Sequence, residues 1–149
     1  MEGLSVRGIE PGDRARWEEL YLGYATFYRV HQTPEMRATV WSWLMESTHE
    51  MAGLLAFYEN SPAIGLAHFR SFARPLTATT GLFLDDLFVD PDHRGTGAAD
   101  LLIRAIAEKG RDRGCSVVRW ITAEDNYRAR GLYDRVASRT PWVTYDIKL

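Results

Sequence analysis

The sequence predicts an α/β (α+β) fold, a single domain in which helices cover both faces of a mixed central sheet. Apolar segments of strand length are interleaved with segments of helical periodicity. A turn at Asn60-Ser61-Pro62 between two apolar runs indicates a hairpin, which makes part of the sheet antiparallel. A strand–helix–strand unit over 82–122 makes another part parallel. The length of 149 residues suits one domain, expected to span 1–149.

The first strand is expected over Ser5 to Ile9, where the residues alternate weakly and Pro11-Gly12 ends the pattern. Asp13 is a plausible N-cap for the helix that follows. Apolar and aromatic residues recur there at three- and four-residue steps, which places them on one helical face. They are Trp17, Leu20, Tyr21, Tyr24, Phe27 and Tyr28. This aromatic stripe either packs on the sheet or lines a pocket, where aromatic faces can hold a cation.

A second helix is predicted from Thr33, an N-cap followed by proline at the first helical position, to about Ser47. The two hairpin strands come next, over Met51–Tyr58 and Ala63–Phe72. Ala73 to Thr80 is expected to be an exposed loop. The first half of the chain therefore supplies one strand, two helices and a hairpin.

The second half begins with the strongest strand in the chain, Leu82 to Val89, which Asp90-Pro91 ends. A helix is expected from Ala98 to a closing glycine, Gly114. Three further elements follow in order. They are a strand over Val117–Thr122, a helix over Asn126–Val136 and a last strand over Trp142–Ile147.

Composition disfavours several classes of protein. A net charge of −2 is a poor basis for binding nucleic acid, and we expect no nucleic-acid partner. No apolar run approaches the roughly 20 residues of a membrane span, and the first ten residues lack an apolar signal region. Cys115 is the only cysteine, so no intrachain disulfide is possible, and the four histidines lack metal-like spacing. We expect a cytoplasmic protein with no membrane partner and no metal.

The segment Arg94-Gly95-Thr96-Gly97-Ala98-Ala99 follows the strongest strand and opens a helix. At such a helix start the backbone N–H groups are unpaired and the helix dipole is positive, so an anion can bind there. The two glycines let the backbone approach a phosphate, and Arg94 adds a fork of donors that matches phosphate oxygens. The pattern is neither the Walker loop nor the dinucleotide-binding motif. It is either an anion-binding loop or a glycine turn that only caps the helix.

The region from Leu82 to Val136 closely resembles the GNAT superfamily of N-acetyltransferases. Arg94, Gly97 and Ala99 stand at the positions of the motif that binds the pyrophosphate of coenzyme A in that family. The stretch from Asp85 to Pro91 is similar to the family's central strand, and 126–133 resembles its asparagine–alanine–tyrosine helix. The end of the chain is most similar to the yeast-type branch that acetylates histones, polyamines or D-amino acids.

The resemblance implies that acetyl-CoA is the cosubstrate and that the acetyl group passes directly to an amine in a ternary complex. It assigns backbone N–H groups of the central strand to the acetyl carbonyl and the pantetheine arm. It assigns the glycine loop to the pyrophosphate and two side chains of the C-terminal helix to the coenzyme arm and the sulfur. The expected cofactor-binding residues are Leu87, Phe88, Val89, Arg94, Gly95, Thr96, Gly97, Ala98, Ala99, Asn126 and Tyr133.

Two side chains are expected to be catalytic. Tyr133 is placed near the sulfur, where a phenol can donate a proton to the leaving thiolate. Asp85 stands where polyamine acetyltransferases carry glutamate, and it can draw a proton from the amine through water. Asp86 is expected on the opposite face of the strand, because strand side chains alternate. Cys115 is expected to take no part, and His93 flanks the phosphates.

The acceptor is expected to be a primary amine: a small amine, a polyamine, an amino acid or a lysine of a peptide or protein. A homodimer is possible, with the strand at Trp142–Tyr145 as the shared edge. Two alternatives remain open, a non-catalytic sensor of acyl-CoA and a protein-interaction domain whose glycine loop binds nothing. A third variation keeps the enzyme but uses a longer acyl donor.

Overall fold

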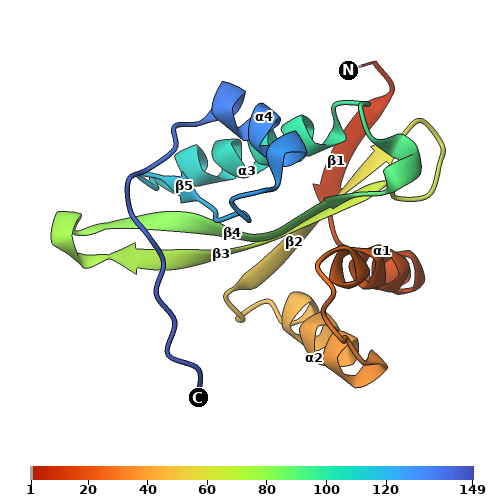
Figure 1. Cartoon of the computed structure of the whole chain (residues 1–149). Coiled ribbons are helices and arrows are strands. Elements are labelled where there is room, and N and C mark those ends of the chain that lie inside the picture. Colours follow the sequence, from red (N-terminus) through yellow and green to blue (C-terminus); the bar gives the residue numbers. More distant parts are fainter. Residues whose placement is uncertain (1) are drawn as a thin grey trace.

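The computed structural model describes residues 2–149, and its centre is a five-stranded sheet with the order β1-β2-β3-β4-β5 (Figure 1). The strands are β1 (Leu4–Gly8), β2 (Met51–Tyr58), β3 (Gly65–Arg74), β4 (Thr79–Val89) and β5 (Val118–Arg119). The first three pairs of neighbours are antiparallel, and β4 and β5 are parallel. The predicted mixed sheet is therefore confirmed.

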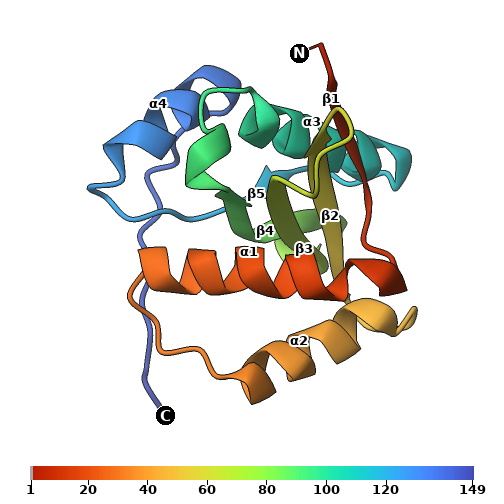
Figure 2. The same ribbon diagram turned by 90° about the vertical axis from the view of Figure 1, so that its right-hand side faces the viewer.

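Helices cover both faces of this sheet (Figures 1 and 2). Helices α1 (Arg14–Phe27) and α2 (Pro34–Met45) pack on one face, and α3 (Ala98–Asp112) packs on the other, with α4 (Tyr127–Val136) beside it. Three short 3-10 turns lie between elements. They are η1 (Pro11–Asp13), η2 (Pro75–Thr77) and η3 (Pro91–His93).

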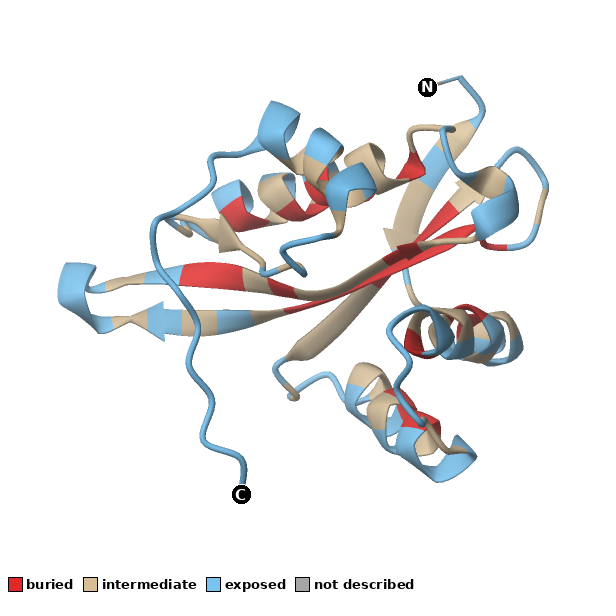
Figure 3. Cartoon of the chain, viewed as in Figure 1, coloured by how far each residue is buried: buried red, intermediate tan, exposed pale blue. Residues whose placement is uncertain are grey.

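The core forms two layers, one on each face of the sheet, and the buried residues concentrate along the central strands (Figure 3). Ala67, Phe69 and Leu84 point toward α3, whereas Leu66 and Phe88 point toward α1 and α2. This division follows from the alternation of side chains along a strand. Apolar side chains therefore cover both faces of the central parts of β3 and β4.

The aromatic stripe of α1 is buried at its start and exposed at its end. Trp17 is completely buried against the sheet, while Tyr21 and Tyr24 are only partly buried. Phe27 and Tyr28, at the end of the helix, are exposed. The first part of the stripe is therefore core, and its end is exposed.

The two predicted N-caps differ in outcome. The Oγ1 of Thr33 accepts a hydrogen bond from the backbone N–H of Met36 at 3.2 Å, so this cap of α2 is confirmed. Asp13 directly precedes α1, but its side chain makes no capping bond to that helix. Its carboxylate accepts instead from Arg7 at 2.7 and 3.0 Å and from the backbone N–H of Glu10 at 2.8 Å.

The loop predicted over 73–80 is wrong, because the hairpin of β3 and β4 continues almost to its tip. Register pairs extend to Arg74 and Thr79, and only η2 joins the two strands. The hairpin projects from the sheet (the green arm in Figure 1). Ser116 contacts it near the tip: the backbone N–H of Ser116 donates to the carbonyl of Thr80 at 2.9 Å, and Arg74 donates to Oγ of Ser116 at 2.6 Å.

The last predicted strand, Trp142–Ile147, is also wrong. Residues 137–149 follow α4 as an extended segment without regular secondary structure, and they are exposed throughout (Figure 3). The alternating pattern identified a segment suited to a sheet, but a strand requires a neighbouring strand for its backbone hydrogen bonds. The fold of one chain does not supply that neighbour.

Candidate active site

The sheet opens between β4 and β5. The prediction of a strand over 117–122 is too long, because β5 pairs with β4 only at Leu82 and Phe83. Beyond these residues the edge of β4 is open. The backbone N–H of Asp90 donates to the carbonyl of Ile64 at 2.8 Å, on the side of β3.

Since backbone N–H groups alternate in direction along a strand, the side to which Asp90 donates fixes the direction of the residues before it. Leu87 and Val89 direct their N–H groups toward the open edge. Phe88 directs its N–H toward β3 and its ring into the core beside α1. Of the three residues expected to hold the acetyl and pantetheine groups, two have donors at the opening.

A β-bulge in β4 lies next to this edge. His68 is opposite Asp86 and Phe69 is opposite Leu84, so Asp85 is the extra residue of the bulged strand. Asp86 bonds His68 Nδ1 at 2.8 Å, and Asp85 accepts from Nε of Arg70 at 3.0 Å.

The bulge brings both carboxylates to one face of the sheet. His68 and Arg70 are two residues apart on a regular part of β3, so they share the face that carries α1. Their partners Asp85 and Asp86 therefore share that face too. The prediction that Asp86 points away from Asp85 is wrong, because a bulge resets the alternation of side chains.

The two adjacent carboxyl groups have different electrostatic environments. Burial raises the pKa of Asp85 above its ordinary value, and the nearby Arg70 only partly offsets this. Burial also acts to raise the pKa of Asp86, but hydrogen bonds from His68, Tyr21 and Tyr24 outweigh it and lower that pKa. Asp86 is thus the more strongly anionic member of the pair.

The glycine loop follows β4 and η3. Gly95 and Gly97 have φ angles of 81° and 93°, in the left-handed region that favours glycine. A Cβ at Gly95 would meet no atom within 4 Å, so the space beside it is open. Thr96 donates from Oγ1 to the carbonyl of His93 at 2.8 Å, which fixes the turn. Gly97 is the N-cap residue of α3, whose first helical residues are Ala98 and Ala99.

The residues of this loop fit a phosphorylated cofactor. The first turn of α3 offers N–H groups without intrahelical partners, and the glycines leave them accessible. Arg94 is exposed, with its guanidinium 5.6 Å from the centre of the Phe27 ring. Among residues 2–149, Nδ1 of His93 is a buried polar atom without a hydrogen-bond partner. A cleft of about 530 Å³ lies alongside, between α1 and η3.

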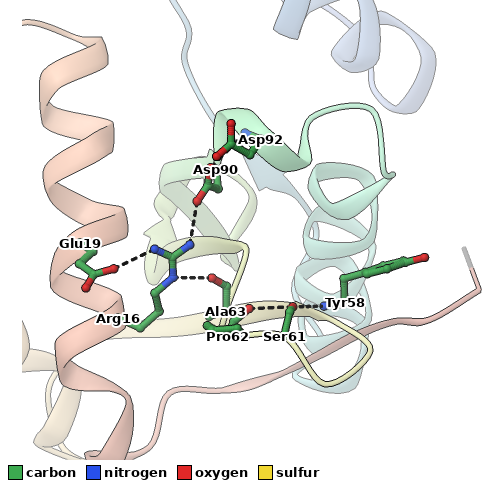
Figure 4. Close-up of polar contacts among 8 residues, drawn as sticks. All are labelled: Arg16, Glu19, Tyr58, Ser61, Pro62, Ala63, Asp90 and Asp92. Atoms are coloured by element: carbon green, nitrogen blue, oxygen red, sulfur yellow. Dashed lines mark hydrogen bonds and ion pairs between the residues drawn. The ribbon is translucent and has the colours of Figure 1, made fainter.

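Arg16 holds the start of this loop, and the sequence analysis did not identify it (Figure 4). Its guanidinium bonds Asp90 Oδ2 at 2.7 Å, the carbonyl of Ala63 at 2.8 Å and Glu19 Oε2 at 2.9 Å. One side chain of α1 therefore joins the turn between β2 and β3 to the end of β4. The sequence could suggest only the contact with Glu19, which is three residues away on the same helix. Asp90 is 74 residues away, so no local pattern predicts that contact.

Asn126 and Tyr133 lie on the other side of the opening, at the start and on the inner face of α4. Asn126 Nδ2 donates to Thr122 Oγ1 at 3.2 Å and to the hydroxyl of Tyr28 at 3.4 Å, so α4 begins beside the end of α1. The Tyr133 ring meets Trp120 edge-on at 5.4 Å and packs against the same buried cluster as Leu87. Burial raises the pKa of Tyr133 to about 12.

Cys115 lies apart from these residues. It lines a separate cleft of about 250 Å³ between α3 and the segment that contains β5. Within residues 2–149, no cluster of three or more His, Cys, Asp or Glu side chains is arranged to hold a metal ion. None of the described helices combines the length and the apolar character required to cross a membrane.

Comparison with known proteins explains this arrangement. Residues 16–137 match the model of the acetyltransferase (GNAT) family. The chain belongs to the GNAT acetyltransferase family. It is 31% identical over 143 residues to the D-amino-acid N-acetyltransferase HPA3 of Saccharomyces cerevisiae. The aligned region covers 95% of this chain and 89% of HPA3. A thialysine N-epsilon-acetyltransferase of Bos taurus is 34% identical over 39% of this chain and 34% of its own length.

Solved GNAT structures have the same fold. The aminoglycoside N-acetyltransferase AAC(6')-Iy, solved in complex with CoA, superposes with a TM-score of 0.83 over 97% of this chain and 94% of its own, at 19% identity. The ribosomal-protein-alanine N-acetyltransferase of Brucella melitensis gives a TM-score of 0.82 over 98% and 99%, at 22% identity. The predicted family, its yeast-type branch and the fold are confirmed, and the chain is an N-acetyltransferase enzyme.

Proposed function

We propose that this GNAT enzyme transfers the acetyl group of acetyl-CoA directly to a primary amine in a ternary complex. The observation that carries the proposal is the alignment of two anion-binding features along β4. The open edge presents the N–H groups of Leu87 and Val89, and the same strand then leads into the glycine loop and the N-terminus of α3. A molecule with a polarised carbonyl at one end and a pyrophosphate at the other is complementary to both.

The pyrophosphate is assigned to the loop from Arg94 to Ala99. Backbone N–H groups of Gly95 to Ala99 surround the anion at the helix N-terminus, and Arg94 adds charge-assisted bonds. Asn126 is assigned to the coenzyme arm, since it stands at the start of α4 across the opening. This assignment accounts for the left-handed glycines, which position backbone donors that no side chain could supply.

The reaction requires one bond to form and one to break. The amine nitrogen attacks the thioester carbon, and the developing oxyanion accepts hydrogen bonds from the N–H groups of Leu87 and Val89. Collapse of this intermediate breaks the carbon–sulfur bond and releases the thiolate. Asp85 takes the proton of the amine through water, and its raised pKa suits a proton acceptor.

Tyr133 is assigned to the leaving sulfur. With a pKa of about 12 the phenol stays protonated at neutral pH, as a donor must. A thiol has an ordinary pKa of about 8.5, so complete proton transfer from this phenol is uphill. Tyr133 therefore acts first by donating a hydrogen bond that stabilises the thiolate as the carbon–sulfur bond breaks.

The acceptor is proposed to be a small aliphatic amine. The sequence relatives are named for D-amino acids and thialysine, and a solved structure with this fold for aminoglycosides; all three carry aliphatic amino groups. A polyamine or a peptide lysine has the same reacting group. A screen with D- and L-amino acids, thialysine, spermidine, an aminoglycoside and a lysine peptide distinguishes among these classes.

The experiment is a calorimetric titration of the protein with acetyl-CoA, followed by a thiol-release screen of these amines. Binding together with amine-dependent thiol release supports the enzyme. Binding without release from any amine favours the sensor of acyl-CoA. Absence of binding contradicts the cofactor assignment and favours an interaction domain. A longer acyl-CoA, tested in parallel, shows whether the enzyme prefers an acetyl group or a longer acyl group.

We further propose that the chain forms one domain over 1–149 and works in the cytoplasm as a homodimer. The exposed residues of its last segment support the dimer. Val143, Tyr145 and Ile147 alternate with polar residues and are 72%, 90% and 88% exposed. Such a segment suits a strand whose partner belongs to a second copy, which would bury these side chains. A single cysteine is consistent with a reducing compartment.

A further inference from the structure

A buried chain of hydrogen bonds links α1 to the bulge of β4. The indole Nε1 of Trp17 donates to Nε2 of His68 at 2.9 Å, and Nδ1 of His68 lies 2.8 Å from Oδ2 of Asp86. Trp17 and His68 are completely buried. Fifty-one residues separate Trp17 from His68, so the chain exists only in the folded protein.

The geometry determines which ring nitrogen of His68 carries the proton. An indole nitrogen can only donate, so Nε2 of His68 accepts and carries no proton. The single proton of the neutral ring is therefore on Nδ1, from which it is donated to Asp86. His68 is neutral in this arrangement and does not neutralise the carboxylate.

Within the part of the chain that the structure describes, the groups that donate hydrogen bonds to Asp86 are neutral. The Tyr21 hydroxyl donates to Oδ2 at 2.9 Å, and the nearby Tyr24 phenol also helps to lower the pKa of this carboxyl. The neighbouring Asp85 is paired with Arg70, whereas among residues 2–149 the one ion-pair contact of Asp86 is with neutral His68. A partly buried negative charge thus lies beside two tyrosine rings without a cation.

We propose that Asp86 binds the positively charged nitrogen of the acceptor, and that His68 and Trp17 are positioning residues that hold its carboxylate. The acceptor is then an aliphatic amine that arrives as an ammonium ion, not an arylamine, which is neutral at the same pH. The faces of Tyr21 and Tyr24 favour the same charge. After binding, the proton passes from nitrogen to Asp85 through water, which leaves a neutral amine to attack.

This proposal rests on the proposed function, and its first test is Asp86→Asn. We expect the KM of the amine acceptor to rise about 10- to 100-fold, because a charge-assisted contact is lost. The Kd of acetyl-CoA is expected to stay within about twofold, which also shows that the variant is folded. Glu108→Gln is the matched control, because Glu108 is an exposed carboxylate on α3 that bonds only Arg111.

The second test separates positioning from simple packing. Trp17→Phe keeps an aromatic ring but removes the donor to Nε2 of His68. Nitrogen-15 NMR of the imidazole is expected to show the Nδ1–H tautomer in the wild-type protein. In Trp17→Phe the Nε2 resonance is expected to shift, because Nε2 loses its donor, together with a higher acceptor KM. His68→Asn retains a donor near the Nδ1 position, so it is expected to keep more acceptor affinity than His68→Ala.

The outcomes are distinguishable from those of the proposed function. If the wild-type protein acetylates amines but Asp86→Asn leaves the acceptor KM unchanged, the assignment of Asp86 is overturned and the proposed function stands. An Nε2–H tautomer in the wild-type protein would overturn the positioning role. If the wild-type protein releases no thiol with any amine, the proposed function fails and this inference fails with it.

Discussion

At the scale of single residues, Asp85 and Asp86 show how neighbouring groups of one kind acquire different properties. They differ in the direction of their pKa shifts because, among the described residues, Asp86 bonds both His68 and Tyr21, whereas Asp85 bonds Arg70. A pair with diverging pKa values is suited to separate tasks, one group accepting a proton and the other keeping its charge. The assignments of base and ammonium site follow this difference.

Asp85→Asn is expected to lower kcat by about 10²- to 10⁴-fold, the usual contribution of a general base. A base acts when it is deprotonated, so the wild-type rate should fall as the pH falls through the pKa of Asp85. Because burial raises that pKa, this acid limb lies above the ordinary aspartate value of about 3.9. The limb should be absent from the pH profile of the variant. An unchanged kcat would contradict the assignment of Asp85 as the general base.

Tyr133→Phe is expected to reduce kcat about 10- to 100-fold while the Kd of acetyl-CoA changes little, because only the hydroxyl assigned to the leaving thiolate is lost. Tyr127→Phe is the matched control, since Tyr127 is an exposed tyrosine at the start of the same helix. Steady-state kinetics and calorimetry separate the two effects. Equal losses in both variants would argue against a role at the sulfur.

Arg94→Ala is expected to weaken acetyl-CoA binding about 10- to 100-fold, through loss of charge-assisted bonds to phosphate. S-acetylpantetheine lacks the pyrophosphate, so its use as a donor should be unaffected by the same change. Arg104→Ala, on the exposed side of α3, serves as the control. Equal effects on the two donors would show that Arg94 acts elsewhere than on the pyrophosphate.

At the scale of elements, α3 is bounded by left-handed glycines with different tasks. Gly95, near its start, and Gly114, after its end, have φ angles of 81° and 72°, and a Cβ at either would meet no atom within 4 Å. The conformational strain of alanine is therefore similar at both sites. Only Gly95 adjoins the proposed position of the pyrophosphate.

Gly95→Ala and Gly114→Ala are each expected to lower the free energy of unfolding by about 1–2 kcal/mol, because alanine is strained in the left-handed region. Only Gly95→Ala should also weaken acetyl-CoA binding, since its Cβ would occupy space next to the phosphates. Urea denaturation and calorimetry measure the two quantities. Equal cofactor affinity in both variants would place the pyrophosphate away from this turn.

The elements also show what sequence can predict here. The strand, glycine loop and helix over 82–112, and the cap at Thr33, depend on residues close together in the chain, and these predictions agree with the structure. The bulge at Asp85 depends on pairing with β3, and no local pattern reveals it. For the same reason, the candidate site was predictable in its loop, whereas the contacts of Arg16 and of His68 with Trp17 were not.

At the scale of the whole molecule, the segment 137–149 is the part that a single chain leaves uncovered. Trp142 is 82% exposed, in line with the alternating apolar residues that follow it. Exposure of so many apolar side chains to water is unfavourable, and association of two copies would remove it. Burial of apolar surface would thus drive the proposed dimer, and strand pairing would determine how the two copies are oriented.

A variant that ends at residue 138 is expected to be monomeric, while the full chain sediments as a dimer. Analytical ultracentrifugation over a range of concentrations makes the comparison. Lys148→Ala, which alters a polar position of the segment, serves as the control and should remain dimeric. Sedimentation of the full chain as a monomer at all concentrations would contradict the proposed interface.

The guanidinium of Arg16 has a consequence for how the two substrates bind. It connects α1, which carries the tyrosines of the proposed acceptor site, to Asp90, next to the loop proposed to bind the cofactor. A ligand that stiffens one of these parts also restricts the other, so the second ligand loses less conformational freedom when it binds. By thermodynamic reciprocity, acetyl-CoA should raise the affinity for the amine by the same factor as the amine raises the affinity for acetyl-CoA. The enzyme would then respond to the supply of one substrate according to the concentration of the other.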